Sequence, residues 1–180
     1  MQKNIGSVLA LYPMPILVVG TIVNEKPNWI LVGHSGIIGH DRVMVSLVES
    51  HYTNQGIRNT KKLSINIIDE KLLKKADYVG SVSGKKTDKS EVFEYKIGEG
   101  GTPIIADAPV VMECEVEDIY KIPNFESFIC KILNTYVQEE NLDEKNKIDY
   151  DKVKPVLFEF PKYTYLKTGE TLGKCLRLDK

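Results

Sequence analysis

Runs of β-branched and aromatic residues, separated by short polar turns, are the feature that most limits how this chain can fold. Residues 15–23 (PILVVGTIV) form one apolar run, and the turn NEKP joins it to a second, residues 28–35 (NWILVGHS). Two such runs around four turn-forming residues predict an antiparallel β-hairpin. The glycine-rich segment GHSGIIGHD predicts a loop, and residues 42–49 (RVMVSLVE) after it predict a third strand.

Two further segments, residues 63–67 and 110–118, alternate apolar and polar side chains. This alternation is typical of a strand with one buried face. In the second segment the core face would hold Met112, Cys114 and Val116, and the opposite, solvated acidic face would hold Glu113, Glu115 and Glu117. Residues 125–137 predict its hairpin partner across the turn KIPN, and residues 154–160 predict the last strand before the tail.

Helical signals are few and short. Residues 53–62 are polar around Ile57, which predicts a short surface helix. A second helix is predicted over residues 70–79, with Asp69 as its N-cap and Gly80 as the residue that ends it.

Two stretches have no periodic pattern. Residues 81–102 predict a long irregular loop with at most one helical turn around residues 90–95, and residues 138–151 predict a charged loop. The count is therefore six or seven strands in hairpin-like succession with two short helices. This order favours a closed or nearly closed antiparallel β-barrel over a parallel dinucleotide-binding sheet.

Composition excludes several classes of protein. The chain has 180 residues, with 24 Lys and Arg against 25 Asp and Glu, so no overall charge favours nucleic acid or an anionic membrane. A single domain over residues 1–180 is expected at this length. We find no signal peptide and no apolar run of the ~18 residues that a spanning helix needs, which predicts a cytoplasmic protein. Three cysteines without CxxC spacing predict reduced, buried thiols.

Several catalytic and binding motifs are absent. Gly80, Gly84 and Lys85 only superficially resemble a phosphate-binding P-loop, because Lys86 stands where Ser or Thr is required. The glycines of GHSGIIGHD are not spaced as a dinucleotide fingerprint. The three histidines have no metal-ligand spacing, and no GxSxG nucleophile motif is present. These observations predict no metal site and no acyl-transfer site.

The segment that joins the third strand to the first helix is dense in hydroxyl and amide side chains: Ser50, His51, Tyr52, Thr53 and Asn54. A helix start offers free backbone N–H groups and a positive dipole end, which together suit a phosphate. The same side chains could instead cap the helix, and residue chemistry alone slightly favours capping. The nearby cations Arg58, Lys61 and Lys62 suit a dianion, although they also suit a solvated helix face.

The order and spacing of six segments resemble the flavin reductase-like family of FMN-binding split barrels, and within it the flavoredoxin-type proteins. These segments are PMPILVVGT, PNWI, SHYTNQGIRNTKKLSIN, ADYVGSVSGKKTDKS, APVVMECEV and YTYLKTGETLG, and they cover nearly the whole chain. The resemblance implies a mainly β fold, a six-stranded antiparallel split β-barrel with Greek-key connections and short flanking helices. It also implies a homodimer with one FMN per subunit near the dimer interface.

The resemblance also assigns residues to the flavin. Ser50, Tyr52 and Thr53 would hold the phosphate, with His51 and Asn54 close by. Three residues, Asn28, Trp29 and Ile30, would lie along the isoalloxazine or ribityl chain. Two more, Ser46 and Leu47, would make backbone contacts with the flavin ring. The pocket would be completed, from the same or the second subunit, by Asn66, Ser83, Gly84, Asp88 and Lys89. Trp29 as a core residue and Asn66 as a purely structural amide are the competing interpretations.

We therefore expect an FMN-binding redox protein that carries electrons, reduced by a nicotinamide or by a protein donor. Flavin chemistry needs little from side chains, so no general acid or base is assigned. One alternative is an NAD(P)H:flavin oxidoreductase that releases reduced flavin. A second is a non-catalytic barrel that binds a ligand or partner through residues 81–102.

Overall fold

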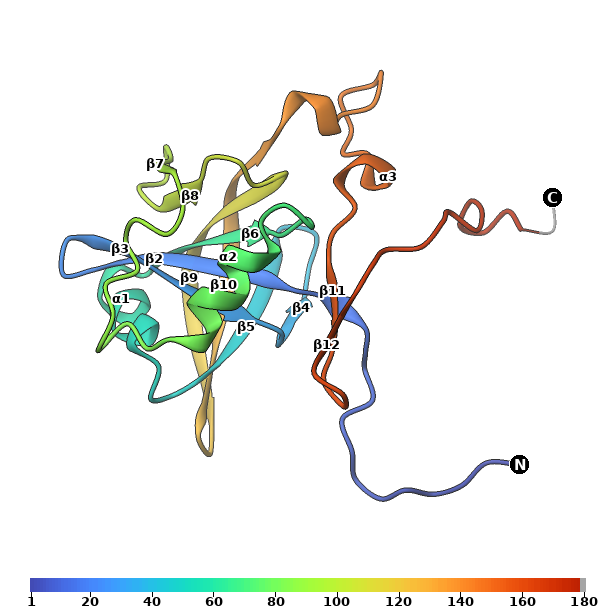
Figure 1. Cartoon of the computed structure of the whole chain (residues 1–180), viewed down its shortest axis with the longest axis horizontal. Helices are drawn as coiled ribbons and strands as arrows, with labels where there is room; N and C mark the ends of the chain where they lie inside the picture. The colour runs from blue at the N-terminus through green and yellow to red at the C-terminus, as the bar shows by residue number, and fades with distance from the viewer. Residues whose placement is uncertain (179–180) are drawn as a thin grey trace.

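The structure is a computed structural model that describes residues 1–178. One curled antiparallel sheet dominates it, with the strand order β3-β2-β6-β9-β10-β5-β4 (Figure 1). Its strands are β2 (Leu17–Val23), β3 (Lys26–Val32), β4 (Ser35–Ile37), β5 (Arg42–Val48), β6 (Lys62–Ile67), β9 (Val110–Ile122) and β10 (Phe125–Val137). Because β6 pairs with both β2 and β9 while β5 pairs with β10, the sheet is not a simple meander. The predicted antiparallel barrel architecture is confirmed.

The sheet has one strand more than the six expected. Strand β4 pairs with β5, with Ser35 opposite Val45 and Gly36 opposite Met44. The prediction of a loop over this glycine-rich segment is therefore wrong at residues 35–37. A three-residue strand is too short to show alternation, so the glycines dominated the local signal.

Two small sheets lie outside the main one. Strands β7 (Tyr95–Ile97) and β8 (Pro103–Ile105) form a hairpin within the stretch predicted to be irregular, and no helical turn forms at residues 90–95. The other sheet has the order β1-β11-β12, built from β1 (Met14–Pro15), β11 (Leu157–Glu159) and β12 (Thr164–Leu166). The last predicted strand is thus shorter than expected, and β12 follows it in the supposed tail. The charged segment before it contains the 3-10 helix η1 (Glu139–Asn141) and helix α3 (Tyr150–Val153).

Both predicted helices form, with shifted ends. Helix α1 spans Tyr52–Thr60, and α2 spans Leu73–Ser81. The Asp69 side chain accepts a hydrogen bond from the Leu72 N–H at 3.0 Å, so it caps the turn that leads into α2. Gly80 does not end the helix as predicted. A Cβ at this position would lie 2.8 Å from Leu31 Cβ, so the glycine allows α2 to pack closely on β3.

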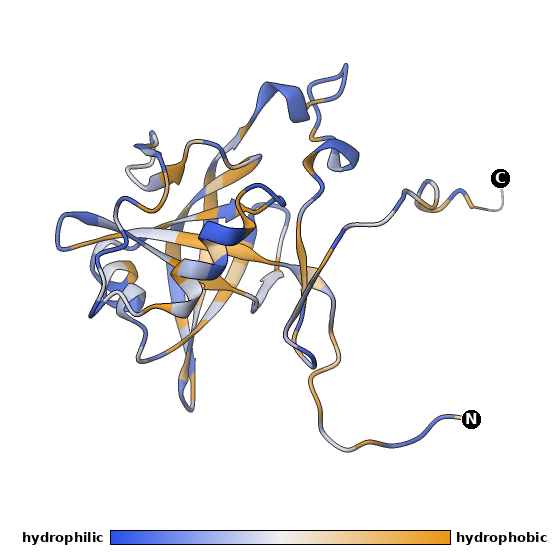
Figure 2. Cartoon of the chain, viewed as in Figure 1, coloured by the Kyte–Doolittle hydropathy of each residue, from blue (hydrophilic) through white to orange (hydrophobic). Residues whose placement is uncertain are grey.

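Buried apolar residues form two clusters, one on each face of the curled sheet. Figure 2 shows the hydrophobic residues along its strands. The first fills the barrel interior and includes Val19, Leu63, Cys114 and Phe128. The second lies under α2 and the β7–β8 hairpin and includes Trp29. The main sheet is therefore buried on both faces, which explains why β2 reads as a continuous apolar run rather than an alternating one.

The acidic face predicted for β9 is wrong at Glu113. Its side chain is fully buried and accepts hydrogen bonds from the Gly100 N–H at 2.8 Å and from the hydroxyls of Thr102 and Tyr136 at 2.7 and 2.9 Å. Asn134 adds a fourth donor at 3.0 Å. Burial opposes ionisation of this carboxyl, but these donors together outweigh burial and lower its pKa to about 2. Glu113 thus fixes the loop between β7 and β8 to the sheet.

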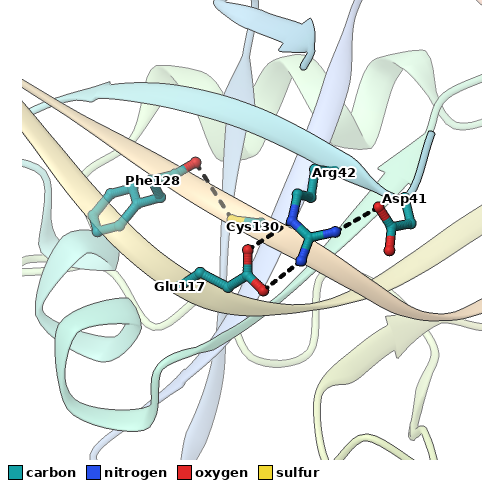
Figure 3. Close-up of polar contacts among 5 residues, drawn as sticks. All are labelled: Asp41, Arg42, Glu117, Phe128 and Cys130. Carbon is teal, nitrogen blue, oxygen red and sulfur yellow. Dashed lines mark hydrogen bonds and ion pairs between the residues drawn. The ribbon is translucent and has the colours of Figure 1, made fainter. Parts of the chain in front are cut away.

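The remaining features of β9 and β10 are ordinary. Glu117 is exposed and accepts two hydrogen bonds from Arg42, at 2.8 and 2.9 Å, as Figure 3 shows. Cys114 and Cys130 are buried free thiols, whereas Cys175 is a free thiol exposed to solvent, so the prediction of buried thiols is wrong for Cys175. Burial raises the pKa of both buried thiols, that of Cys130 to about 12.

Within residues 1–178, no cluster of potential metal ligands occurs, and none of the helices is long and apolar enough to cross a bilayer.

Candidate functional site

The turn between β5 and α1 leaves the start of α1 without a side-chain cap. The chain turns at Glu49 and Ser50, and the His51 N–H donates to the Val48 carbonyl at 3.0 Å. His51 occupies the N-cap position with an extended backbone, and its side chain makes no capping hydrogen bond. Among the described residues, the side chains of Ser50, Thr53 and Asn54 accept no hydrogen bond from the first-turn N–H groups either. The capping interpretation is therefore wrong, and the helix start offers donors to an anion.

The polar side chains of α1 point instead to the strands beside it. Asn28, on β3, donates from its amide nitrogen to the Thr53 hydroxyl at 2.7 Å, and both side chains are buried. Asn54 donates to the buried carboxylate of Glu126 at 2.8 Å. These contacts fix α1 against the edge strand β3 and the interior strand β10 of the main sheet, and so set the direction of its first turn.

The loop after α2 lies against this helix start. A Cβ at Gly84 would lie 2.4 Å from Asn28 Oδ1 and 2.7 Å from a ring carbon of Tyr52, so glycine allows the closest approach of the loop. Asp88 pairs with Lys26 at 2.7 Å, an ion pair that, with a donor from Ser90, holds the pKa of Asp88 well below its usual range. The structure therefore brings the loop, through Gly84, to the start of α1 within the same chain.

Lys89 is a buried cation in this loop. Its Nζ donates to the carbonyls of Val79 and Val82 at 3.0 and 3.2 Å, at the end of α2, and only 4% of the residue is exposed. Burial lowers the pKa of Lys89 to about 8. The pKa of His51 is lowered as well, first by burial and second by the charge of Lys89. The Nδ1 atom of His51 is buried and has no hydrogen-bond partner among the described residues.

The cations expected to attract a dianion lie elsewhere. Arg58 is in the last turn of α1 and pairs with Glu126, Lys61 is the C-cap of the helix, and Lys62 begins β6. All three are at the end of α1 opposite to its free N–H groups. Lys89 is a cation close enough to the helix start to act on His51, because a loop distant in sequence folds back onto it.

A family model described as "Flavin reductase like domain" matches residues 9–167. The chain belongs to the flavin reductase-like family. It is similar to the flavoredoxin of Methanosarcina acetivorans, at 32% identity over 100% of this chain and 98% of that one, with a TM-score of 0.94. It is also similar to the flavoredoxin of Desulfovibrio vulgaris (Miyazaki F), at 28% identity over 100% of both chains, with a TM-score of 0.92. No curated protein matches the chain in sequence.

A third structure shows the shared fold. The FMN-binding protein of Thermus thermophilus has 22% identity, 97% coverage of both chains and a TM-score of 0.82. The split-barrel fold class and the family resemblance inferred from sequence are thus confirmed, and a flavin-associated redox function follows from family membership.

Other site residues predicted for this flavin reductase-like chain lie inside the protein. Trp29 is fully buried and meets Phe93 edge-on at 5.5 Å between ring centroids, while its Nε1 has no partner among the described residues. Ile30 and Leu47 belong to the barrel core. Their side chains serve packing in the core, and their backbones are paired with β2 and β10.

Two predicted polar residues have internal partners. Asn66 donates to the Val18 carbonyl at 3.0 Å and accepts from the Ile105 N–H at 2.9 Å, so it connects β2, β6 and β8. Ser46 shares a hydrogen bond of 2.6 Å with Ser127 on β10. These contacts favour the interpretation that the amide of Asn66 serves only to hold the strands together.

Sequence reasoning missed two residues beside the site. Asn24 donates to the Tyr52 hydroxyl at 3.1 Å, and Lys26 holds Asp88. Both belong to the NEKP turn, immediately before PNWI. The only sequence feature that could have pointed to Asn24 and Lys26 is their position next to PNWI, because their contacts with Tyr52 and Asp88 depend on the fold.

Proposed function

We propose that the protein binds FMN with its phosphate at the start of α1 and works as a flavin-dependent redox protein. The observation that carries the proposal is the uncapped helix start beside the unpartnered Nδ1 of His51. Buried polar atoms are almost always hydrogen-bonded, so an unpartnered imidazole nitrogen next to free N–H groups suits an anionic ligand in the tautomer in which this nitrogen carries the proton. Lys89 supplies the positive charge that a phosphate dianion favours.

Several groups at this turn would bind the phosphate. The hydroxyls of Ser50 and Thr53 and the first N–H groups of α1 would donate to it, with Tyr52 and Gly84 forming the wall beside it. Asn28 would position Thr53 through the hydrogen bond between them. The backbone near Ser46 and Leu47 on β5 would face the flavin ring.

FMN, when bound, supplies the chemistry by accepting and giving up electrons one or two at a time. The chain's own groups bind it, orient it and limit the access of water. No side chain is assigned as a general acid or base. We further propose a homodimer, reduced by a nicotinamide or a protein donor, that acts as an electron carrier; release of reduced flavin is the competing activity.

The test is a pair of titrations, with FMN and with riboflavin, which lacks the phosphate. We expect the purified protein to bind FMN more tightly than riboflavin. Replacing Ser50 and Thr53 together by Ala removes two hydrogen bonds to a charged group, each worth about 1.5–3 kcal/mol. FMN affinity should then fall about a hundredfold or more, while riboflavin affinity stays within about twofold. A protein that binds neither flavin would refute the proposal.

The two redox activities differ in how they handle the flavin. A carrier should retain FMN through gel filtration and be reduced slowly by NADH and NADPH in stopped-flow measurements. A flavin reductase should oxidise one nicotinamide rapidly and lose reduced FMN to solution. These outcomes decide between the two activities without affecting the assignment of the phosphate site.

A further inference from the structure

The N-terminal arm, residues 1–11, leaves the body of the protein and becomes mostly apolar in its second half, residues 8–11. Figure 1 shows it running away from the barrel, and Figure 2 shows apolar segments along it. Its large side chains are exposed, Ile5 by 68%, Val8 by 56%, Leu9 by 52% and Leu11 by 75%. The described hydrogen bonds of this arm join only Gly6 to Asn4. Within residues 1–178, the arm therefore makes no hydrogen bond to the body of its own chain in this conformation.

A cavity of about 780 Å³ opens beside the root of the arm. One wall is formed by residues 10–15, and most of the remaining lining comes from six strands of the main sheet, including the side chains of Met44, Ile65, Met112 and Ile132. Ile65 belongs to the core, and Met112 and Ile132 pack against it. The cavity is thus an open part of the barrel core, and protein cores are normally filled to high density.

We propose that the arm of a second copy of this chain fills the cavity, with Val8 and Leu9 inserted into the open part of the core. In a two-fold dimer the exchange is reciprocal, so each arm occupies the cavity of its partner. This inference deepens the homodimer of the proposed function and rests on it. The arm exposes apolar side chains, and the cavity exposes apolar core side chains, so the two surfaces are complementary. Burying the apolar surface of both would stabilise the dimer.

The geometry at the root of the arm favours a second copy over the chain's own arm. Strand β1 pairs with β11 through Met14 and Pro15, which fixes the direction in which the arm begins. Residues 10–15 run along the rim of the cavity, and the rest of the arm continues away from the body (Figure 1). Ile37, which is 86% exposed on the edge strand β4, extends the apolar rim on another side.

The test replaces Val8 and Leu9 by Asp. Both side chains are exposed, so the substitution leaves the folded monomer unchanged. We expect light scattering after gel filtration to give about twice the 20.3 kDa chain mass for the wild type. The dimer dissociation constant should rise at least about hundredfold in the variant, because two apolar groups at each contact become charged. The matched control is Leu172→Asp with Leu176→Asp in the exposed C-terminal segment, which should remain dimeric.

The cavity itself is tested by Ile37→Asp on its rim. If the arm and the rim touch, the combined variant should weaken the dimer by less than the product of the two separate effects. A purely multiplicative result, a wild-type monomer, or an equal loss of dimer in the control would each overturn the proposal. FMN and riboflavin titrations of the same variants report separately on the proposed function.

Discussion

The buried carboxylate of Glu113 should make the stability of this protein strongly dependent on acid. Its pKa falls from an ordinary value of 4.5 to about 2, because four neighbouring residues donate hydrogen bonds to a group that burial alone would leave neutral. One pKa unit corresponds to about 1.4 kcal/mol of differential interaction. Ionised Glu113 therefore contributes about 3 kcal/mol to the free energy of unfolding.

The sign of the effect follows from the lowered pKa of the folded state. The contribution is fully present above pH 4.5 and is lost as the pH falls through the folded value of about 2. Chemical denaturation of the wild type and of Glu113→Gln between pH 2 and pH 7 measures it. We expect the variant to be less stable by about 3 kcal/mol at neutral pH. The difference should shrink steadily below pH 4.5.

The control is Glu115→Gln, two residues away on the same strand and exposed to solvent. It should change the unfolding free energy by no more than about 0.5 kcal/mol at any pH. The reasoning is refuted if Glu113→Gln matches the wild type at neutral pH, or if the difference between them does not depend on pH.

Two further predictions concern the flavin site. Because burial lowers the pKa of Lys89 to about 8, the positive charge of Lys89 is present below that pH and lost above it. The ratio of FMN affinity to riboflavin affinity should therefore fall as the pH rises through 8. In Lys89→Met the same ratio should not change with pH. Gly84→Ala introduces a Cβ only 2.4 Å from Asn28 Oδ1, so we expect a loss of stability of about 1–3 kcal/mol together with weaker FMN binding. Gly169 has open space around it, so Gly169→Ala should change neither stability nor FMN affinity. Thermal melts and FMN titrations measure the two effects.

Much of the fold could be predicted because the strands carry local patterns. The hairpin at NEKP, the strand over residues 63–67 and the turn KIPN all depend on residues close in sequence. Glu113 could not be placed this way, since its donors come from the β7–β8 loop and from β10. A glutamate in an alternating strand is indistinguishable from its exposed neighbours until those donors are known.

The candidate site was predictable in its parts rather than in its contacts. Family resemblance selected PNWI, SHYTN and the loop around Gly84, and the structure brings all three together. Local reasoning pointed to Arg58, which is near the turn in sequence but lies at the far end of α1. Lys89 could be recognised only once α2 had carried its loop back to the helix start.

The burial of two cysteines has a practical consequence. Cys114 and Cys130 lie in the barrel core with raised pKa values, so at neutral pH they stay protonated and closed to thiol reagents. Cys175, in the exposed segment beyond β12, is open to them. The unmodified chain therefore carries one natural attachment point for a fluorophore or spin label, and distance measurements from it can test the proposed dimer without introducing a cysteine.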